Sequence, residues 1–239
     1  ILGMVILPGC TKSQVLKGKS EEEQLEKQKE KSPYYFSFTV TKEEGNKLNT
    51  YNYISDFETK TIDEKSKIPY TSQYPLTVYL DSKDEVYYTY REDGAGDDEI
   101  YRKKCGSLNG NRLTDSLFAV NYIFPFADRV YLVAVENGTR AMGLFKLENG
   151  EICRMLKDED AFVWQVNYNS DIEKIVFNTY SQSEFDEKMA NNMGEESFGV
   201  NTIYEMDLET ERIQKIADVE AGYMTAIVLD SSGDIYYQI

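Results

Sequence analysis

The sequence contains no histidine, only three cysteines and a single tryptophan among its 239 residues. Histidine is the commonest metal ligand and the side chain best suited to proton transfer near neutral pH, so its absence argues against many classes of enzyme. The motifs G-x-S-x-G, Walker A, H-E-x-x-H and C-x-x-C are missing as well. We therefore expect a protein that is not an enzyme.

Positive charge is also scarce, because 26 basic residues face 42 acidic ones and the net charge is −16. Such a surface repels nucleic acid and bare anionic lipid, which excludes a nucleic-acid partner. The longest apolar run, at the start of the chain, is far shorter than the roughly 20 apolar residues that cross a bilayer.

Aromatic residues, by contrast, are abundant: the chain has 19 tyrosines and 11 phenylalanines. Valine, isoleucine and threonine are common as well, whereas alanine is scarce, and this composition favours strands over helices. We expect an all-β fold, in one large domain or two average ones.

The chain opens on ILGMVILPGC, an apolar stretch that ends at a cysteine. Leu7-Pro8-Gly9-Cys10 resembles the bacterial lipobox. That resemblance implies that residues 1–9 are the remnant of a signal peptide and that Cys10 carries lipid, which anchors the protein to the extracytoplasmic face of the cell membrane. No initiating methionine or basic segment precedes the run, so we expect a sequence truncated at its N-terminus. The other interpretation is an ordinary buried strand followed by a turn.

Residues 10–32 follow as a dense mixture of charges with almost no apolar periodicity. Such a segment cannot bury enough apolar surface to fold alone. We expect a disordered polar tether between the lipidated Cys10 and a folded domain at residues 33–239.

Residues 53–59 and 204–210 share the pattern Y-x-x-D-[F/L]-E-T, and residues 144–150 are a looser third copy. Each copy reads as a strand with alternating faces, a tight turn (Glu-Thr or Asn-Gly) and a return strand. The repeats therefore predict hairpins.

A polar turn that launches a β-branched and aromatic strand occurs four times, with apolar residues at Val86, Val130, Ile175 and Ile235. The first three are spaced by about 44 residues, and the last interval is longer. The excess falls in residues 181–199, an acidic stretch that breaks the strand pattern. We interpret it as an insertion between two strands of one repeat, where function is often found.

A period of about 44 residues with four short strands per unit is typical of a β-propeller blade. Residues 81–115, DSKDEVYYTYREDGAGDDEIYRKKCGSLNGNRLTD, resemble the TolB-type (PD40, WD-like) propeller repeat, with Lys83 in place of that pattern's proline. The resemblance implies four-stranded antiparallel blades over residues 33–239.

Blade boundaries are predicted at residues 33–70, 75–115, 117–158 and 161–218, with another blade begun at 222. The fragment then holds about four to five blades of a partial ring. Because TolB-like propellers have more blades, we expect the sequence to be truncated at its C-terminus too.

Carboxylates gather in the glycine-rich stretch at Asp93, Asp97, Asp98 and Glu99. Their oxygens suit calcium, which is the one cofactor that the sequence suggests. The favoured interpretation is a solvated turn between strands, with glycine supplying positive φ. The acidic residues of the insertion have the same two interpretations: Glu184, Asp186, Glu187, Glu195 and Glu196.

Trp164 is predicted on a strand that lines the inner edge of a blade. It belongs either to a ligand surface at the channel mouth or, as we favour, to the core.

Cys105 and Cys153 fall in neighbouring predicted blades, where a disulfide is permitted outside the cell. Unpaired, partly buried thiols are the favoured alternative.

Three classes of function remain open. The first is a cell-surface lipoprotein whose propeller is a non-catalytic binding or scaffold module for a protein, a peptide or an envelope glycan. The second is an extracytoplasmic sensor of a solute or signal. The third is the non-catalytic propeller of a hydrolase whose catalytic domain is missing.

Overall fold

The computed structural model describes residues 35–56, 59–148, 150–191, 198–220 and 222–239. The predicted signal remnant at residues 1–9, the lipidated Cys10 and the tether at 10–32 lie outside the described residues.

The described residues form five antiparallel sheets, each a meander of strands in sequence order. Sheet one contains β1 (Tyr35–Glu44), β2 (Lys47–Asp56) and β3 (Thr61–Pro69). Sheet two contains β4 (Thr77–Leu80), β5 (Glu85–Tyr90), β6 (Glu99–Lys104) and β7 (Asn111–Arg112), and the 3-10 helix η1 (Asp81–Lys83) connects β4 to β5. Sheet three contains β8 (Leu117–Phe126), β9 (Arg129–Glu136), β10 (Met142–Glu148) and β11 (Glu151–Arg154). Sheet four contains β12 (Ala161–Asn169), β13 (Lys174–Ser181), β14 (Val200–Asp207) and β15 (Ile213–Glu220), and the helix α2 (Gln182–Ala190) lies between β13 and β14 in the chain. Sheet five contains β16 (Ala226–Leu229) and β17 (Ile235–Gln238).

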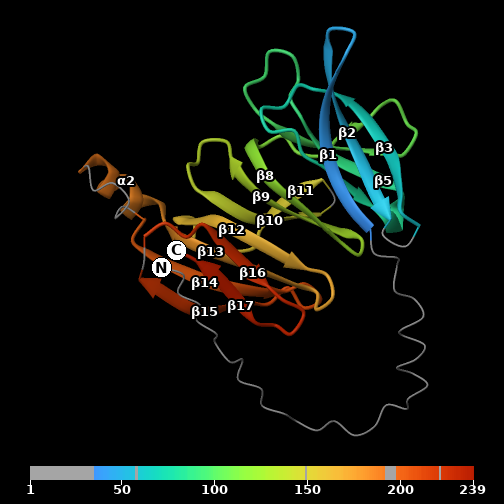
Figure 1. Cartoon of the computed structure of the whole chain (residues 1–239). Helices are drawn as coiled ribbons and strands as arrows, with labels where there is room; N and C mark the ends of the chain where they lie inside the picture. Colours follow the sequence, from blue (N-terminus) through green and yellow to red (C-terminus); the bar gives the residue numbers. More distant parts are fainter. Residues whose placement is uncertain (1–34, 57–58, 149, 192–197, 221) are drawn as a thin grey trace, which may run out of the picture.

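The sheets follow one another like the blades of a fan (Figure 1). This is a partial β-propeller of four-stranded antiparallel blades, as the repeats predict. The sheets coincide with the predicted blades, except that the first has three strands among the described residues. In the complete fourth blade, the Y-x-x-D-[F/L]-E-T motif lies at the turn between the third strand, β14, and the fourth strand, β15. In the first sheet the same motif lies between β2 and β3. The strands β1–β3 therefore correspond to the second, third and fourth strands of a complete blade.

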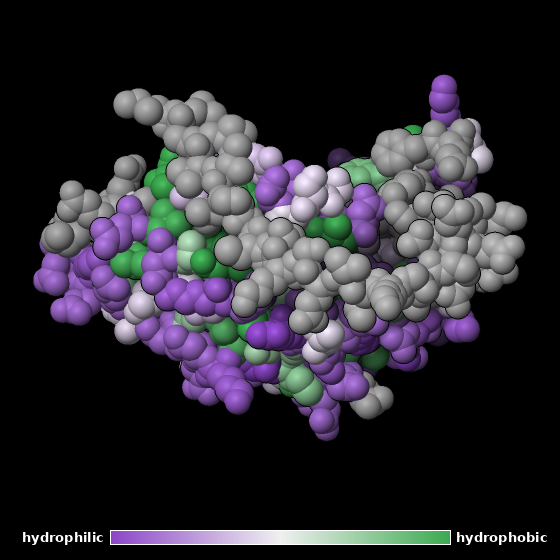
Figure 2. All heavy atoms as spheres, turned by 90° about the horizontal axis from the view of Figure 1, so that it is seen from below, coloured by the Kyte–Doolittle hydropathy of each residue, from purple (hydrophilic) through white to green (hydrophobic). Residues whose placement is uncertain are grey.

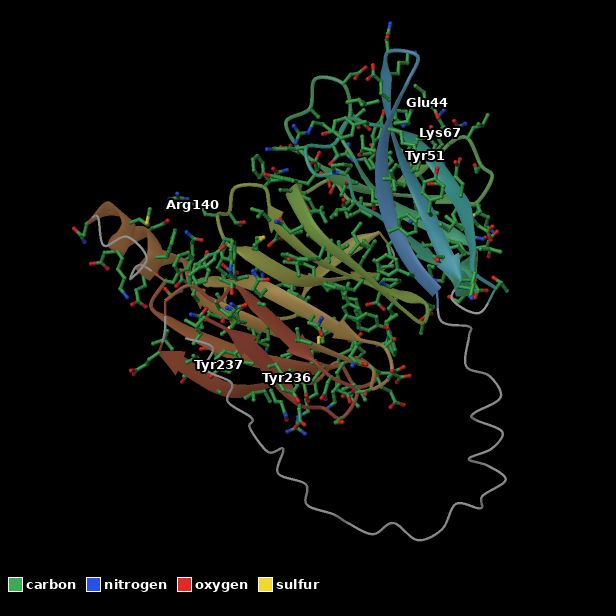
Figure 3. The ribbon with its side chains drawn as sticks, viewed as in Figure 1. Glu44, Tyr51, Lys67, Arg140, Tyr236 and Tyr237 are labelled. Carbon is green, nitrogen blue, oxygen red and sulfur yellow. The ribbon has the colours of Figure 1, made fainter. Side chains whose placement is uncertain are left out.

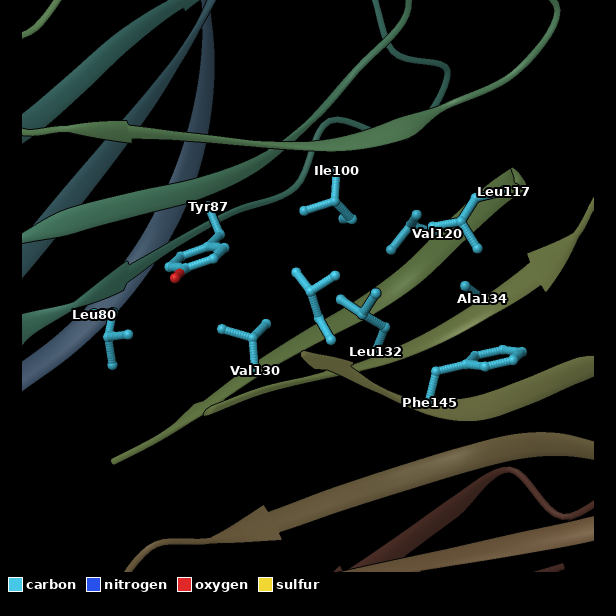
Figure 4. Close-up of a cluster of buried hydrophobic side chains, with 10 residues drawn as sticks. Leu80, Tyr87, Ile100, Leu117, Val120, Val130, Leu132, Ala134 and Phe145 are labelled. Atoms are coloured by element: carbon cyan, nitrogen blue, oxygen red, sulfur yellow. The ribbon is translucent and has the colours of Figure 1, made fainter. Parts of the chain in front are cut away.

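The second strand of each complete blade is buried on both faces, because the sheet packs between two neighbours. The sequences EVYYTY, RVYLVAVE and KIVFNTYS of β5, β9 and β13 are accordingly almost continuous runs of β-branched and aromatic residues. Buried clusters fill the spaces between adjacent sheets. Figure 4 shows the one between sheets two and three, with Leu80, Tyr87 and Val130 toward one end of it and Leu117 toward the other.

The repeated Asp-x-x-Thr element closes a hairpin turn. Asp56 Oδ1 accepts a hydrogen bond from the Thr59 amide at 3.1 Å, and Asp207 Oδ1 accepts from the Thr210 amide and hydroxyl, both at 2.7 Å. A carboxylate that replaces the missing backbone partner explains why the motif recurs at this place in the blade.

An ion cluster joins sheets three and four at the end of the blades opposite to α2. The Glu211 carboxylate accepts hydrogen bonds from Arg129 Nη1 at 2.9 Å, Lys146 Nζ at 3.0 Å and the Tyr131 hydroxyl at 3.1 Å. The three donors come from β9 and β10, whereas Glu211 lies in the turn between β14 and β15. The cluster thus fixes one blade against the next.

Cys105 and Cys153 are both free thiols, as the favoured interpretation predicts, but only Cys105 is partly buried, because Cys153 is exposed. Burial, followed by the hydrogen bond to Asp84, raises the pKa of Cys105 to about 11, so its thiol is scarcely ionised at neutral pH.

Hydrophilic side chains dominate the surface in Figure 2, with small apolar areas between them. No helix among the described residues is long and apolar enough to cross a membrane.

Candidate binding site

One end of the blades carries most of the longer connections. Since strands in a meander alternate in direction, the turns after β5, β9 and β13 and the linkers between sheets emerge at the same end. We call this end the loop face, made by residues 70–76, 91–98, 137–141, 155–160, 182–191, 198–199 and 222–225. In Figure 1, α2 projects from it beside the fourth sheet.

Six aromatic residues meet at the loop face around α2, and we call them the aromatic cluster: Phe162, Trp164, Tyr180, Phe185, Phe198 and Tyr223. Neighbouring ring centroids are 4.8 Å apart for Phe198 and Tyr223, 4.9 Å for Phe185 and Phe198, and 5.5 Å for Trp164 and Tyr223. These separations are typical of favourable aromatic pairs. The cluster joins β12, β13, α2 and the linker that precedes β16.

The cluster is partly a core and partly a surface. Tyr180 is buried, and burial raises the pKa of its hydroxyl. Trp164 is half-buried, and its indole Nε1 donates a hydrogen bond to the Met224 carbonyl at 3.0 Å. Tyr223 is 39% exposed. Trp164 therefore packs in a fixed orientation beside the exposed ring of Tyr223, and its role in a ligand surface stays a prediction.

Helix α2 is fixed at its N-terminus, which holds Phe185 in the cluster. The Ser181 hydroxyl is the N-cap and accepts from the Glu184 amide at 3.1 Å. Asp160 accepts from the Ser181 hydroxyl at 2.5 Å and from the Ser183 amide at 2.8 Å, and the first of these bonds is the main reason that the pKa of Asp160 is lowered.

A second contact holds the middle of α2. Arg140, in the turn after β9, forms an ion pair with Asp186 at 2.9 Å, and Figure 3 shows this arginine beside the helix. Residues 181–199 are therefore an insertion between two strands of one blade, as predicted, but the first half is a helix rather than a loop.

A polar pocket of about 360 Å³ lies beside Gln182, the first residue of α2, and is lined mainly by sheet three and the connections at its loop-face end. Arg154 lines it and forms an ion pair with Glu136 at 2.7 Å. The remaining lining residues are Asn137, Thr139, Arg140, Ala141, Glu159, Asp160 and Gln182.

The structure does not bring the predicted calcium ligands together. Asp93 is exposed and Asp97 is half-buried, with its Oδ2 accepting from Asn137 Nδ2 at 3.5 Å. Asp98 is buried and accepts from Arg91 Nε at 3.0 Å and from the Gln73 amide at 3.2 Å.

Glu99 is turned inward as well. It accepts from the Thr114 hydroxyl at 2.5 Å, from Arg112 Nη2 at 3.2 Å and from the Leu117 amide at 3.3 Å. Burial raises the pKa of Glu99, and this effect is larger than the opposite effect of the hydrogen-bond donors, which lower the pKa. Asp98 and Glu99 therefore hold the chain together locally, and the described residues contain no group of three or more His, Cys, Asp or Glu side chains that fits a metal ion.

The acidic residues of the insertion divide in the same way. Glu184 pairs with Lys188 at 2.5 Å and Asp186 pairs with Arg140, so both support α2. Glu187 lies on the same helix, and Glu195 and Glu196 lie outside the described residues.

Sequence reasoning identified one member of the aromatic cluster, Trp164. It missed the other members, although a signal exists: Tyr180 directly precedes the insertion and Phe198 lies at its end. Aromatic residues that flank an insertion in a strand pattern indicate a place where the inserted segment packs back on the sheet.

No protein-family model matches the sequence, and no curated protein sequence matches it. Solved structures do. The chain is similar to the acylaminoacyl peptidase of Pyrococcus horikoshii, with 17% identity and a TM-score of 0.52 over 80% of this chain and 27% of that one. It is also similar to TolB from Acinetobacter baumannii, with 12% identity and a TM-score of 0.51 over 84% of this chain and 51% of that one.

These identities are low, so the likeness concerns the fold alone. The chain spans about half of the TolB structure and about a quarter of the peptidase. Both matches cover most of this chain. The chain therefore has the fold of part of a TolB-like β-propeller.

Proposed function

We propose that the chain is the non-catalytic binding module of a bacterial lipoprotein, and that its loop face binds a protein, a peptide or an envelope glycan. One observation carries this proposal: the aromatic cluster is held rigidly by α2 and Trp164, yet presents Tyr223 to solvent. Rigid, partly exposed aromatic rings are the side chains that contribute most to binding surfaces, because they bury large areas with little loss of side-chain entropy.

A solute or signal sensor is the second candidate function. It is favoured by the polar pocket of about 360 Å³ beside α2, whose size suits a small molecule. A third candidate, the propeller of a hydrolase, is supported by the name of the similar acylaminoacyl peptidase. The absence of histidine from the whole sequence supports a module without catalysis of its own.

The binding proposal predicts that Tyr223→Ala weakens capture of the partner by about tenfold, since losing a central aromatic contact costs at least ~1.4 kcal/mol. The measurement is a pull-down from a bacterial envelope extract and from purified peptidoglycan, with the lipid-free chain as bait. Phe36→Ala is the matched control, because Phe36 is an aromatic residue that is 57% exposed in β1, outside the loop face. Equal capture by both variants would place the partner elsewhere.

The anchor is proposed from the sequence of residues 1–10. Two or more acyl chains give stable anchoring, since each buried methylene adds about 0.8 kcal/mol. We expect the protein produced in bacteria with a complete signal peptide to partition into detergent and to incorporate a palmitate analogue. Cys10→Ser is expected to abolish both, whereas Cys153→Ser is the control. Retained labelling of Cys10→Ser would refute the anchor.

A further inference from the structure

A pocket of about 810 Å³ lies between sheets two and three, at the opposite end of the blades from the loop face. Its walls come from η1, β5, β6 and β7 on one side and from β9, β10 and the turns after β8 and β10 on the other. The apolar lining residues Tyr87, Val130 and Leu147 belong to the buried cluster between the sheets, and Figure 4 shows Tyr87 and Val130 extending into that cluster from opposite sides. The pocket is therefore built on a rigid floor.

Its charge is opposite to that of the whole molecule. Four of its lining residues are cations, Lys83, Arg102, Arg112 and Arg129, and two are acids, Asp128 and Glu148. The chain as a whole has 42 acidic and 26 basic residues. In a strongly acidic protein, this local excess of cations makes the electrostatic potential positive at the pocket, which favours an anion there.

Two of the cations, Arg112 and Arg129, already donate hydrogen bonds to other groups of the protein. Arg112 donates to the Thr114 carbonyl at 2.7 Å and to Glu99 at 3.2 Å, and Arg129 donates to Glu211 at 2.9 Å. They supply positive potential to the pocket but have little freedom to turn toward a ligand.

The other two cations retain donor capacity. Arg102 is 37% exposed, and its ion pair with Glu85 spans 3.7 Å, too long for a hydrogen bond. It also contacts the Tyr87 hydroxyl, but a guanidinium has five N–H donors. Lys83 donates to the Asp128 carbonyl at 2.7 Å, and an ammonium has further N–H donors. Asn111 adds an amide to the same lining.

We propose that this pocket binds a small dianion with carboxylate or phosphate oxygens, gripped by the guanidinium fork of Arg102 and by Lys83. A guanidinium matches two oxygens of such a group in one plane, and an ammonium adds a point charge. The short carbon skeleton of the ligand lies against Leu113, Val130 and Leu147. This pocket is separate from the loop face, so the result of its test does not depend on whether the proposed function is correct.

The test uses the whole chain with succinate and inorganic phosphate as probes, at constant ionic strength adjusted with chloride. Binding to the native state raises the melting temperature in a saturable way, which thermal unfolding and calorimetry measure. Arg102→Ala is expected to weaken binding by about tenfold or more, and Arg102→Lys by less, since it keeps the charge and loses the fork. Saturation with succinate alone identifies a dicarboxylate, and saturation with phosphate alone identifies a phosphate ligand.

Lys47→Ala is the control, because it removes one positive charge at an exposed residue of sheet one. Its binding is expected to equal that of the unmodified chain. The proposal is overturned if neither probe gives a saturable shift, if Arg102→Ala binds as tightly as the unmodified chain, or if Lys47→Ala weakens binding as much as Arg102→Ala.

Discussion

Replacing Glu99 with alanine is expected to lower the free energy of unfolding by about 3 kcal/mol at neutral pH. The side chain is 5% exposed and accepts hydrogen bonds from Thr114, Arg112 and the Leu117 amide. Its removal leaves a buried amide and a buried hydroxyl without their acceptor and removes the carboxylate that faces Arg112. Urea denaturation of both proteins measures the difference.

The same experiment separates a structural carboxylate from a calcium ligand. Asp93→Ala is the matched control, because Asp93 is an exposed acid of the same stretch and is expected to change stability by less than about 0.5 kcal/mol. Both results are expected to be the same with calcium or with a chelator. A calcium-dependent rise in stability that Asp93→Ala and Glu99→Ala abolish would contradict the structural role.

Glu211→Ala is expected to destabilise the chain by about 2 kcal/mol near neutral pH, less than a fully buried ion pair, since Glu211 is 26% exposed and partly screened. The substitution leaves Arg129, Lys146 and the buried Tyr131 hydroxyl without their shared acceptor. Because the donors and the acceptor belong to different sheets, the loss weakens the packing of one blade on the next. Chemical denaturation measures it.

The stabilisation by Glu211 depends on pH in a predictable direction. Burial alone raises a carboxyl pKa, but hydrogen bonds from Lys146, Arg129 and Tyr131 outweigh it, so the pKa of Glu211 lies below its ordinary value of 4.5. The native chain therefore binds this proton less readily than the unfolded chain. The contribution is complete above pH 4.5 and is lost as the pH falls through the folded pKa.

Glu211→Gln isolates that effect, because its amide does not titrate. Its stability difference from the unmodified chain is expected to shrink as the pH falls below 4.5. Glu209→Ala, at an exposed acid of the same turn, is the control and is expected to show little difference at any pH. A gap between Glu211→Gln and the unmodified chain that does not change with pH would contradict the depressed pKa.

Blade boundaries were predictable from the sequence because they depend on local signals. The turn motif at Asp207 and Thr210 is closed by hydrogen bonds three residues apart, and the strand that follows a polar turn at Ile175 is recognised by its own apolar run. Residues 161–218 were accordingly predicted as one blade, and the fourth sheet runs from β12 to β15.

Local patterns were enough to predict the all-β class, the repeat and the position of the insertion, since strand alternation and turn chemistry act between near neighbours. Which side chains meet could not be predicted in this way, because it depends on how distant parts of the chain pack. Trp164 donates to the Met224 carbonyl, and Glu211 joins Arg129, across sixty or more residues. The pocket at Arg102 likewise exists only because sheet three packs beside sheet two. Such contacts depend on how whole blades pack, and no pattern within a single repeat encodes them.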